Sequence, residues 1–368
     1  MDEDKDQTIQ PPVRRHHHHH HHRKQRQFHV WRWVGGIVAV IVIGLAGGAY
    51  YVYHTLHSTA DHTYIPLNNQ KNSSSALSKN KPISILLMGT DTGALGRTEK
   101  NGRSDTMILA TLNPAKKTTT MVSIPRDTMA KMVGDNGINI QKINAAYSIG
   151  GADMAVNTTT ALLGVPVNYY AVINMGGLEK IVNALGGVEI TPILSFSNMG
   201  YTFTKGKVTK MDGKEALAYI RMRYEDPKGD YGRQDRERQV ITAIIKTAPQ
   251  LKNLTKYQEL MSQVQSNFRS NMSFDDMVAL FNKYRDAGKN VKQDHLQGVG
   301  AYLNGSSYQI ASTKELQRVS DLINKSLNLP TAKLNNEETK QNALNPNFNW
   351  GSGYTKAKYT VQGADQVN

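Results

Sequence analysis

The stretch ISILLMG, residues 83–89, marks where the folded part of this 368-residue chain begins. It is an apolar run of strand length, and such runs are typical of strands buried in a sheet. Two further runs follow, DTMILATL (105–112) and TTTMVSI (118–124). Asn113-Pro114-Ala115-Lys116-Lys117 lies between them and has the composition of a turn. The sequence therefore predicts three strands at the start of the fold, the second and third joined by a turn.

Helical patterns and further strands follow these three strands. Strands are expected at 167–173 and 188–190, and a helix is expected to open at Asp212, with Glu215 completing a capping box. The other expected helices cover 141–148, 151–163, 176–187, 233–248, 254–267, 273–286 and 313–327. Strands and helices intermix without a regular βαβ repeat, so we predict an α/β fold (α+β being the alternative) with three layers, α-β-α, around a mixed central sheet.

An uncharged segment, VGGIVAVIVIGLAGGAYYVY (34–53), lies upstream of the fold. Twenty helical residues span about 30 Å, which is the thickness of a bilayer's hydrocarbon core. Arginines and lysines precede the segment, and the next cation after it is Lys71. This asymmetry predicts a single-pass signal-anchor with a cytoplasmic N-terminus and an external domain. A cleaved signal peptide is the competing interpretation.

The composition predicts the following organisation. Residues 1–33 form a basic, His-rich disordered tail in the cytoplasm, and residues 54–81 form a polar external linker. The His run 16–22 stands in a basic context that suits contact with anionic lipid, with metal binding or an expression tag as alternatives. Residues 82–250 form the principal folded domain and residues 251–330 a helical continuation packed on it. Residues 331–368 are rich in Asn, Gln, Lys, Thr and Gly and are predicted to be disordered.

Residue types exclude several classes of chemistry. The chain has no cysteine, and His295 is the only histidine from residue 82 onward. A cysteine nucleophile, a Ser-His-Asp triad and a multi-histidine metal site are therefore not expected. The phosphate-binding P-loop, the GxGxxG, HExxH and GxSxG motifs are absent from the sequence. With these classes excluded, the candidate functional residues are arginines and carboxylates, in a chain whose formal charge is +14.

Charged residues stand at the ends of the first three predicted strands. Asp91 follows the first strand, Arg103 and Asp105 open the second, and Arg126 follows the third. Ligands of α/β sheets commonly bind at strand ends, and Pro125 would direct Arg126 away from the sheet. Each of these residues alone could be a turn, capping or surface residue. Together they predict a site for an anion.

The stretch YIRMRYEDPKGDYGRQDRER (219–238) supplies more basic residues. Arg221 and Arg223 share a face only if the chain is extended there. Arg233, Arg236 and Gln239 are spaced by three and share a face near the start of a helix, where unpaired N–H groups also attract anions. Glu237 and Arg238 are expected to point elsewhere into solvent, like Glu225. The stretch is therefore either an ordinary salt-bridged surface or one half of an anion site.

Four segments resemble the LytR-CpsA-Psr family of cell-envelope proteins. They are ILLMGTDT, GRSDTMILATLNPAKKTTTMVSIPRDT, KINAAYSIGGADMAVNTTTALLGVPVNYYAVINMGGLEKIVNALGGVEI and DGKEALAYIRMRYEDPKGDYGRQDRERQ, in this order over residues 83–248. The resemblance implies the fold of that family and a phosphotransferase of the envelope, typical of Gram-positive bacteria. It would move a glycopolymer, such as teichoic acid or capsule, from a polyprenyl-pyrophosphate carrier to a peptidoglycan hydroxyl, leaving a phosphodiester.

The resemblance also implies roles for individual residues. Asp91 and Asp105 match acids associated with Mg²⁺, for which Mn²⁺ is a possible substitute. The residues that match phosphate-surrounding positions are Arg103, Arg126, Arg221, Arg223, Arg233, Arg236 and Gln239. Family members often have glutamines where this chain has Glu237 and Arg238. Catalysis would rest on Asp105, Arg126 and Asp91, and the choice of catalytic base between the two aspartates stays open.

The chemistry of these residue types agrees with such a transfer. Arginine binds phosphate oxygens bidentately and keeps its proton, and Mg²⁺ prefers carboxylate and phosphate oxygens. The lipid needs an apolar groove, for which helices 151–163 and 178–185 are candidates. Three alternatives remain: a non-catalytic polyprenyl-phosphate binder, a pyrophosphatase on the same lipid, and an envelope-related transcriptional attenuator. The predicted external location argues against nucleic acid as a partner.

Overall fold

The computed structural model describes residues 64–68, 77, 79–90, 92, 102–247, 264, 266–351 and 354–367, all within the unit Thr55–Asn368. The predicted tail 1–33, the membrane segment 34–53 and most of the linker 54–81 lie outside these residues, as does Asp91. None of the helices in the described ranges combines the length and the hydropathy needed to cross a membrane.

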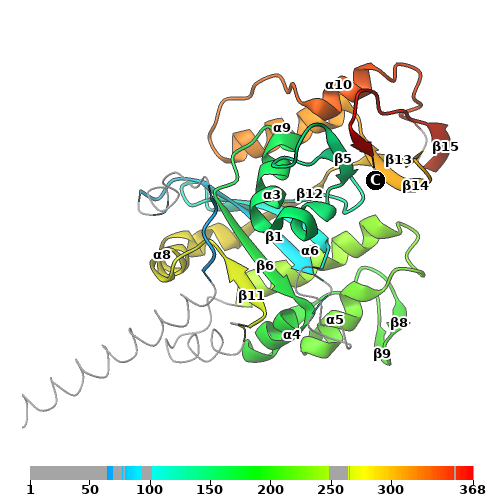
Figure 1. The fold of residues 1–368 in the computed structure, drawn as a ribbon. Helices are drawn as coiled ribbons and strands as arrows, with labels where there is room; N and C mark the ends of the chain where they lie inside the picture. The colour runs from blue at the N-terminus through cyan, green and yellow to red at the C-terminus, as the bar shows by residue number, and fades with distance from the viewer. Residues whose placement is uncertain are drawn as a thin grey trace, which may run out of the picture. The chain divides into compact units, whose positions relative to one another are not determined.

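The centre of the fold is a six-stranded sheet (Figure 1). Its spatial order is β11 (Phe268–Ser270), β6 (Tyr169–Asn174), β1 (Ile83–Thr90), β2 (Ser104–Asn113), β3 (Thr118–Ser123) and β12 (Asn290–His295). β1, β2 and β3 pair antiparallel, whereas β6 and β12 join β1 and β3 in parallel. The three strands predicted first, and the turn between the last two, are confirmed. The central sheet is mixed, as predicted.

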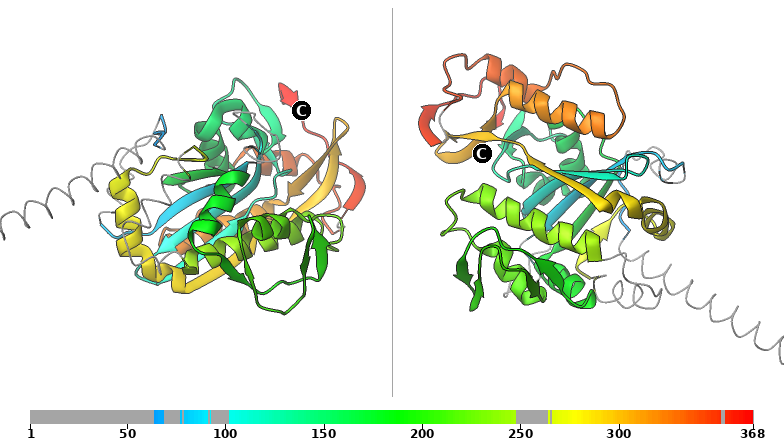
Figure 2. Two further views of the ribbon diagram at one scale, coloured as in Figure 1. Left: turned by 90° about the horizontal axis from the view of Figure 1, so that it is seen from below. Right: turned by 180° about the vertical axis from the view of Figure 1, so that it is seen from behind.

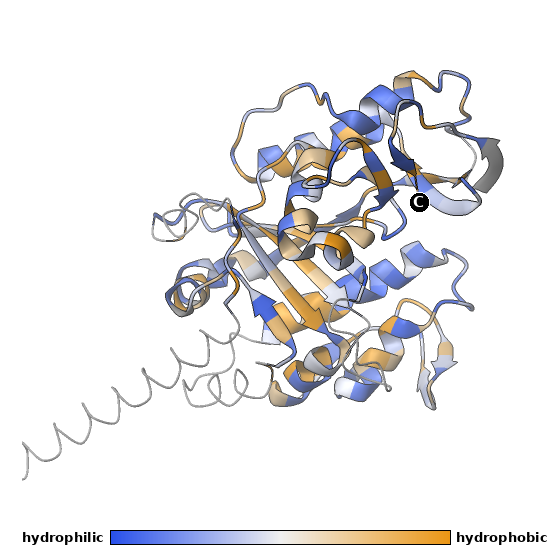
Figure 3. Cartoon of the chain, in the orientation of Figure 1, coloured by the Kyte–Doolittle hydropathy of each residue, from blue (hydrophilic) through white to orange (hydrophobic). Residues whose placement is uncertain are grey.

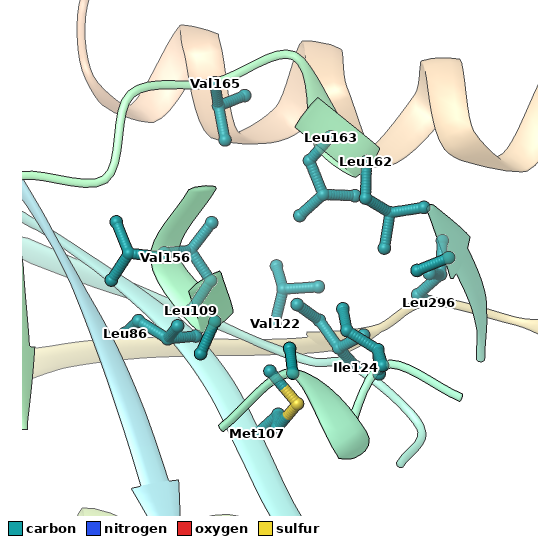
Figure 4. Close-up of a cluster of buried hydrophobic side chains, with 14 of the residues drawn as sticks. Leu86, Met107, Leu109, Val122, Ile124, Val156, Leu162, Leu163, Val165 and Leu296 are labelled. Carbon is teal, nitrogen blue, oxygen red and sulfur yellow. The ribbon is translucent and has the colours of Figure 1, made fainter. Parts of the chain in front are cut away.

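Successive side chains of the central strands alternate between two buried faces, as the pleat requires. Leu86, Met107 and Val122 contribute to a hydrophobic core on one face, together with residues of α3 (Ala145–Leu163) and α9 (Thr313–Ser326). Figure 4 shows Val156 and Leu162 of α3 within this cluster. This face of the sheet is therefore fully covered by α3 and α9.

Other helices cover the opposite face. Ile83 and Ile85 pack there with Met277 of α8 (Phe274–Tyr284), and Ile108 packs with Ile241 of α6 (Asp230–Thr247). α4 (Met175–Ala184) and α5 (Gly213–Arg221) continue this layer next to α6. Figure 2 shows the sheet between its helices from two further directions. The predicted three-layer α-β-α arrangement is confirmed for the described residues.

Two local predictions can be compared with the structure. Asp212 accepts from the Glu215 backbone N–H at 2.9 Å, and the Glu215 side chain accepts from the Asp212 N–H, so the predicted capping box is present. The break predicted between helices 141–148 and 151–163 is confirmed, because the element α3 consists of two helical segments separated by the non-helical residues Gly150 and Gly151. Gly151 has φ +63°, a conformation that favours glycine and ends the first helical segment before the second begins. Residues 141–142 belong instead to a strand, β5 (Asn139–Lys142).

Short strands complete the fold. β4 (Met129–Lys131) pairs with β5, β7 (Val188–Ile190) with β10 (Thr209–Met211), and β8 (Phe196–Asn198) with β9 (Tyr201–Phe203). The 3-10 helix η2 (Arg285–Lys289) follows α8. The segment 251–330 was predicted to be helical, but it also contributes β11, β12, β13 (Gly298–Leu303) and β14 (Ser306–Ala311). The helix predicted at 254–267 lies almost entirely outside the described residues.

The prediction of disorder for residues 331–368 is wrong. This segment forms α10 (Glu337–Ala343), β15 (Tyr354–Lys358), which pairs with β13, and β16 (Gln366–Val367), which pairs with β5. Phe348 and Tyr359 are buried in a small core with Tyr308 of β14. Buried amides supply the remaining contacts: Asn342 donates to the Ala311 carbonyl at 3.0 Å and Asn345 to the Thr360 carbonyl at 2.8 Å. The polar composition therefore hides a folded segment that is held largely by side-chain amides.

Candidate functional site

A pocket of about 650 Å³ opens between the sheet and the helix layer of α4, α5 and α6. Its apolar lining comes from the strands of the sheet and from the three helices, including Leu87, Ile173, Leu178, Leu217 and Ile241. The part of β6 that contributes Ala171 and Ile173 to the lining is coloured as hydrophobic in Figure 3. The pocket therefore offers an elongated apolar chain a place to lie against the sheet.

Charged side chains line the same pocket, and most of them come from the ends of elements. They are Asp105, Arg126, Arg221, Arg223, Arg233 and Glu237, which we call the charged mouth. Asp105 lies near the start of β2, Arg126 follows β3, and Arg233 lies in the first turn of α6. An apolar pocket with an arginine-rich mouth suits an amphipathic ligand that has an anionic head group.

Asp105 is the centre of the mouth. Its Oδ1 lies 3.2 Å from Nη1 of Arg126, and its Oδ2 lies 4.0 Å from Nη2 of Arg223. Asn144, which precedes α3, donates from Nδ2 to the same Oδ1 at 3.3 Å. Burial and then the nearby charges of Arg126 and Arg233 lower the pKa of Arg223. Two guanidinium groups thus share one carboxylate, an arrangement with residual attraction for further anions.

Arg233 is more firmly held. Its Nε and Nη2 donate to Oδ1 of Asp230 at 2.9 and 2.7 Å, Nη1 donates to Glu237, and Nη2 also donates to the Asp105 carbonyl at 3.2 Å. Burial opposes its charge, but Glu237 and Asp230 outweigh that effect and raise the pKa of Arg233. This guanidinium is therefore fixed in place at the mouth as a permanent cation.

Glu237 was predicted to lie in solvent, and this prediction is wrong. It is 6% exposed and lines the pocket, where it accepts from the Thr106 hydroxyl at 2.8 Å and pairs with Arg233. Burial raises the pKa of Glu237, while Arg233 and Thr106 oppose that change. The spacing of four residues from Arg233 on one helix was the signal in the sequence that could have revealed the contact.

Arg238 was also predicted to be solvated, and it is buried as well. Its side chain contacts Ser123 at the end of β3 and Asp235 on α6. Glu225 is exposed, as predicted.

The structure separates three predicted phosphate ligands from the mouth. Arg236 is fully buried and binds the Tyr219 carbonyl at 3.0 Å, the Met222 carbonyl and the Asp226 carboxylate. Gln239 accepts from the Tyr219 hydroxyl at 2.6 Å and donates to the Thr191 carbonyl at 3.0 Å. Arg103 is exposed and does not line the pocket. Arg236 and Gln239 thus anchor α6 to its neighbours, and the structure does not support their direct contact with phosphate.

Helices 151–163 and 178–185 were candidates to line a lipid groove, with a closed core as the alternative for the same composition, and only the second of them lines the pocket. Leu178 and Ile181 of α4 form part of the lining. α3 packs on the opposite face of the sheet, so its Ala/Val/Leu-rich side belongs to the core. The helix α5 and the apolar half of α6 also line the pocket, and the sequence did not indicate this.

A divalent cation can be tested against the donors at the mouth. Mg²⁺ is often held by one or two carboxylates together with substrate phosphates. The Asp105 side chain is 21% exposed and so offers an accessible carboxylate, and its predicted partner Asp91 lies outside the described residues. No group of three or more potential metal-ligating side chains occurs in the part of the chain that the structure describes. A site completed by substrate oxygens is compatible with this donor set.

Comparisons with known proteins agree with the geometry. The LytR_cpsA_psr family profile matches residues 50–325, three quarters of the chain. The chain belongs to this family. It is 44% identical over 293 residues to the polyisoprenyl-teichoic acid–peptidoglycan teichoic acid transferase TagU of Enterococcus faecalis, covering 80% of this chain and 95% of the relative. α10, β15 and β16 lie beyond residue 325, where the match to the family profile ends.

Solved structures of relatives show the same fold. The crystal structure of Bacillus subtilis TagU superimposes with a TM-score of 0.56 and 39% identity, covering 67% of this chain and 97% of that one. The structure of TagT bound to LIIa-WTA gives a TM-score of 0.60 at 28% identity, covering 72% and 100%. The mixed central sheet described above is therefore the sheet of this family.

Proposed function

We propose that this protein transfers a teichoic acid or similar glycopolymer from a polyprenyl-pyrophosphate carrier to a hydroxyl of peptidoglycan. The observation that carries the proposal is the pocket, which joins an apolar interior to the charged mouth. A polyprenyl chain would fill the interior and its diphosphate would meet the arginines. Relatives covered over 94–95% of their own length bear the name of a teichoic acid transferase, which supports the polymer class.

The mouth suits a phosphoryl transfer. Arg126, Arg223 and Arg233 would hold the diphosphate oxygens, and charge that grows on the leaving phosphate would be stabilised by groups already in place. The hydroxyl oxygen of the acceptor forms a bond to the phosphorus next to the polymer, and the bond from that phosphorus to the lipid phosphate oxygen breaks. The products are the phosphodiester and the polyprenyl monophosphate.

The proton of the acceptor hydroxyl needs a base. Asp105 is the candidate within the described residues, because its carboxylate lies among the arginines that would bind the phosphates. Glu237 is paired with Arg233 and Thr106 and is less free to accept the proton. Asp91 is the alternative base.

A magnesium ion is part of this proposal. Asp105, together with Asp91, would hold Mg²⁺ or Mn²⁺, which when bound would neutralise charge on the diphosphate. Arg126 and Arg223 would then share the remaining charge and orient the polymer-linked phosphate toward the acceptor.

The proposal places the enzyme at the membrane. The uncharged segment 34–53, with basic residues before it, would act as a signal-anchor and hold the pocket outside the cell. A topology reporter at the C-terminus tests this location: an external signal is expected, and a cytoplasmic signal would favour the alternative of a transcriptional attenuator.

The activity is tested with the full chain in detergent, a pyrophosphoryl-lipid-linked glycan, peptidoglycan oligomers and Mg²⁺. Linked product is expected from the wild type and a large loss from Arg126→Ala. Arg318→Ala is the matched control, because Arg318 pairs with Asp294 and Glu315 on the surface and does not line the pocket.

The outcomes separate the candidate functions. Equal product yields from the wild type and Arg126→Ala would contradict the proposed site. Release of free phosphorylated polymer without linkage would instead show a pyrophosphatase, and lipid binding without either product would show a carrier protein.

A further inference from the structure

A surface remote from the pocket carries a dense set of basic side chains. Four described segments form it: 79–82, 113–118, 283–292 and 325–330. They contain nine exposed basic residues and one acid, Asp286. The basic residues are Lys79, Lys81, Lys116, Lys117, Lys283, Arg285, Lys289, Lys292 and Lys325, which we call the basic patch.

Contacts between their side chains and main chains show that these segments are neighbours in space although they are far apart in sequence. Nζ of Lys117 and Nζ of Lys289 lie 3.8 and 2.6 Å from the Asp286 carboxylate. Nζ of Lys116 lies 3.4 Å from the Lys325 carbonyl oxygen. The Tyr284 hydroxyl donates to the Lys81 carbonyl, which brings the start of β1 to the same surface. The basic patch is therefore one continuous surface.

The basic patch lies at the end of the sheet opposite to the charged mouth. β1 starts there at Ile83 and ends at Thr90, whose pairing partner Ser104 is next to Asp105 of the mouth. β2 ends and β3 begins at the patch. A strand of eight residues is about 26 Å long, so the two charged surfaces are separated by about that distance. The patch is thus independent of the phosphate site.

An exposed apolar side chain accompanies the basic patch. Leu329 is 40% exposed and follows Asn328, whose side chain accepts from Nδ2 of Asn113 at 3.3 Å. Basic side chains next to an exposed leucine are typical of surfaces that lie at a membrane interface.

The chain enters the fold on the same half of the sheet. The Ile65 N–H donates to the Ser270 carbonyl at 2.8 Å, and the Ile65 carbonyl accepts from the hydroxyl of Tyr170, near the start of β6. The membrane segment predicted from the sequence ends at residue 53, and the residues between it and Tyr64 span at most about 35 Å. The lysines at 79 and 81 come just before β1. The patch is therefore within reach of the membrane that would hold the chain.

We propose that the basic patch docks on anionic phospholipid head groups of the membrane that anchors the protein. The inference rests on the anchorage put forward with the proposed function, although it does not depend on the transfer reaction itself. Docking in this way directs the charged mouth away from the head groups, toward the peptidoglycan that would supply the acceptor.

A competing surface exists at the β8–β9 hairpin and the segment after it. Lys205, Lys207 and Lys210 are exposed there beside Val208, which is 64% exposed. This surface has three cations where the basic patch has nine, so its attraction for an anionic surface is weaker. It provides a matched control in the experiment.

The absence of cysteine from the chain makes the experiment direct. Ala115→Cys, in the exposed β2–β3 turn, and Thr204→Cys, in the exposed hairpin surface, each carry one fluorophore on the full chain in nanodiscs. The discs contain phosphatidylcholine with or without phosphatidylglycerol, and a lipid with a quencher on its head group. We expect severalfold stronger quenching at position 115 when phosphatidylglycerol is present, and little change at position 204. In about 1 M salt, where the screening length is about 3 Å, this difference should disappear.

Two triple variants complete the test. The substitutions Lys116→Gln, Lys117→Gln and Lys289→Gln should abolish the quenching at 115, whereas Lys205→Gln, Lys207→Gln and Lys210→Gln remove the same charge and should leave it unchanged. The inference would be overturned if quenching at position 115 did not depend on phosphatidylglycerol, or if quenching were stronger at position 204. So would recovery of fluorescence on adding soluble poly(glycerol phosphate), since the patch would then be a polymer site. A chain that fails to insert into the discs refutes the anchorage, while loss of transferase activity alone would leave the docking result intact.

Discussion

Two groups of arginines lie within a short distance of each other and have different roles. Arg126 and Arg223 at the charged mouth have side chains 24% and 43% exposed, and their distances to the Asp105 carboxylate are 3.2 and 4.0 Å. Arg236 and Arg238 on α6 are buried, and each is paired closely with its own aspartate. The mouth arginines retain attraction for a ligand, whereas the buried arginines are neutralised within the fold.

The difference follows from burial and pairing together. A buried guanidinium requires a counter-ion and hydrogen-bond acceptors, and Arg236 obtains them from Asp226 and from the carbonyls of Tyr219 and Met222. A half-exposed guanidinium can remain under-paired because water solvates it, and it can exchange that water for phosphate. The residue type alone therefore does not determine which arginine binds a ligand.

The largest effect is expected at the buried arginine. Arg236→Ala leaves Asp226 as a buried charge without a partner, which should lower the free energy of unfolding by about 3–5 kcal/mol. Denaturant unfolding monitored by circular dichroism measures this change. Arg223→Ala, which removes a half-exposed arginine from the mouth, is the matched control and should change stability little. Equal losses in both variants would contradict the division into two groups.

Arg223→Ala should show the reverse pattern in activity. Losing one cation that faces the transition state should lower kcat/KM about a hundredfold, which corresponds to about 2.7 kcal/mol. The measurement is the rate of linkage of a lipid-linked glycan to peptidoglycan oligomers at several substrate concentrations. Arg223→Lys, which keeps the charge and loses the fork, should recover part of the rate. Full activity of Arg223→Ala would remove this residue from the site.

Glu237 tests the boundary between the two groups, because it is buried and also lines the pocket. Glu237→Gln keeps an acceptor for the Thr106 hydroxyl but releases Arg233 from one of its two carboxylates. Binding of a short prenyl pyrophosphate, measured by calorimetry, should tighten about tenfold, or about 1.4 kcal/mol. Glu225→Gln removes the same charge from an exposed position of the same stretch and should have no effect. Weaker binding in Glu237→Gln would show that the carboxylate positions Arg233 rather than competing for it.

The sequence was informative where a local pattern determines the structure. Apolar runs at 83–89, 105–112 and 118–124 predicted the central strands, and Asp212 with Glu215 predicted a helix start. Asp105 and Arg126 were both placed at strand ends, and the antiparallel pairing of β2 with β3 brings them within 3.2 Å. Both residues lie at the same edge of the sheet, and this shared position could be inferred from the order of the strands.

Other features depended on tertiary contacts that no local pattern specifies. Arg233 and Arg236 are three residues apart on one helix, yet one lines the pocket and the other is buried against Tyr219 and Met222. The position of α5, which carries Tyr219 and is followed by Met222, determines that Arg236 is the arginine enclosed by these contacts. The C-terminal segment was misjudged for a similar reason, because the amides of Asn342 and Asn345 are satisfied by carbonyls distant in sequence. A polar composition predicts disorder only when such partners are missing.

The smallest effect is expected at Asp230, the counter-ion that fixes Arg233 at the start of α6. Although burial raises the pKa of Asp230, Arg233 and Gln234 outweigh it and lower the pKa below the usual value. The stability from this carboxylate is therefore present above the pKa of the unfolded chain, about 3.9, and is lost as the pH falls through the lower folded value. Asp230→Asn also removes a negative charge from the first turn of α6, so it should cost about 0.3–1 kcal/mol at neutral pH. Urea unfolding across the acid range should show a smaller loss of stability on acidification in the variant than in the wild type, and identical pH dependence in both would show that Arg233 is held at the mouth without Asp230.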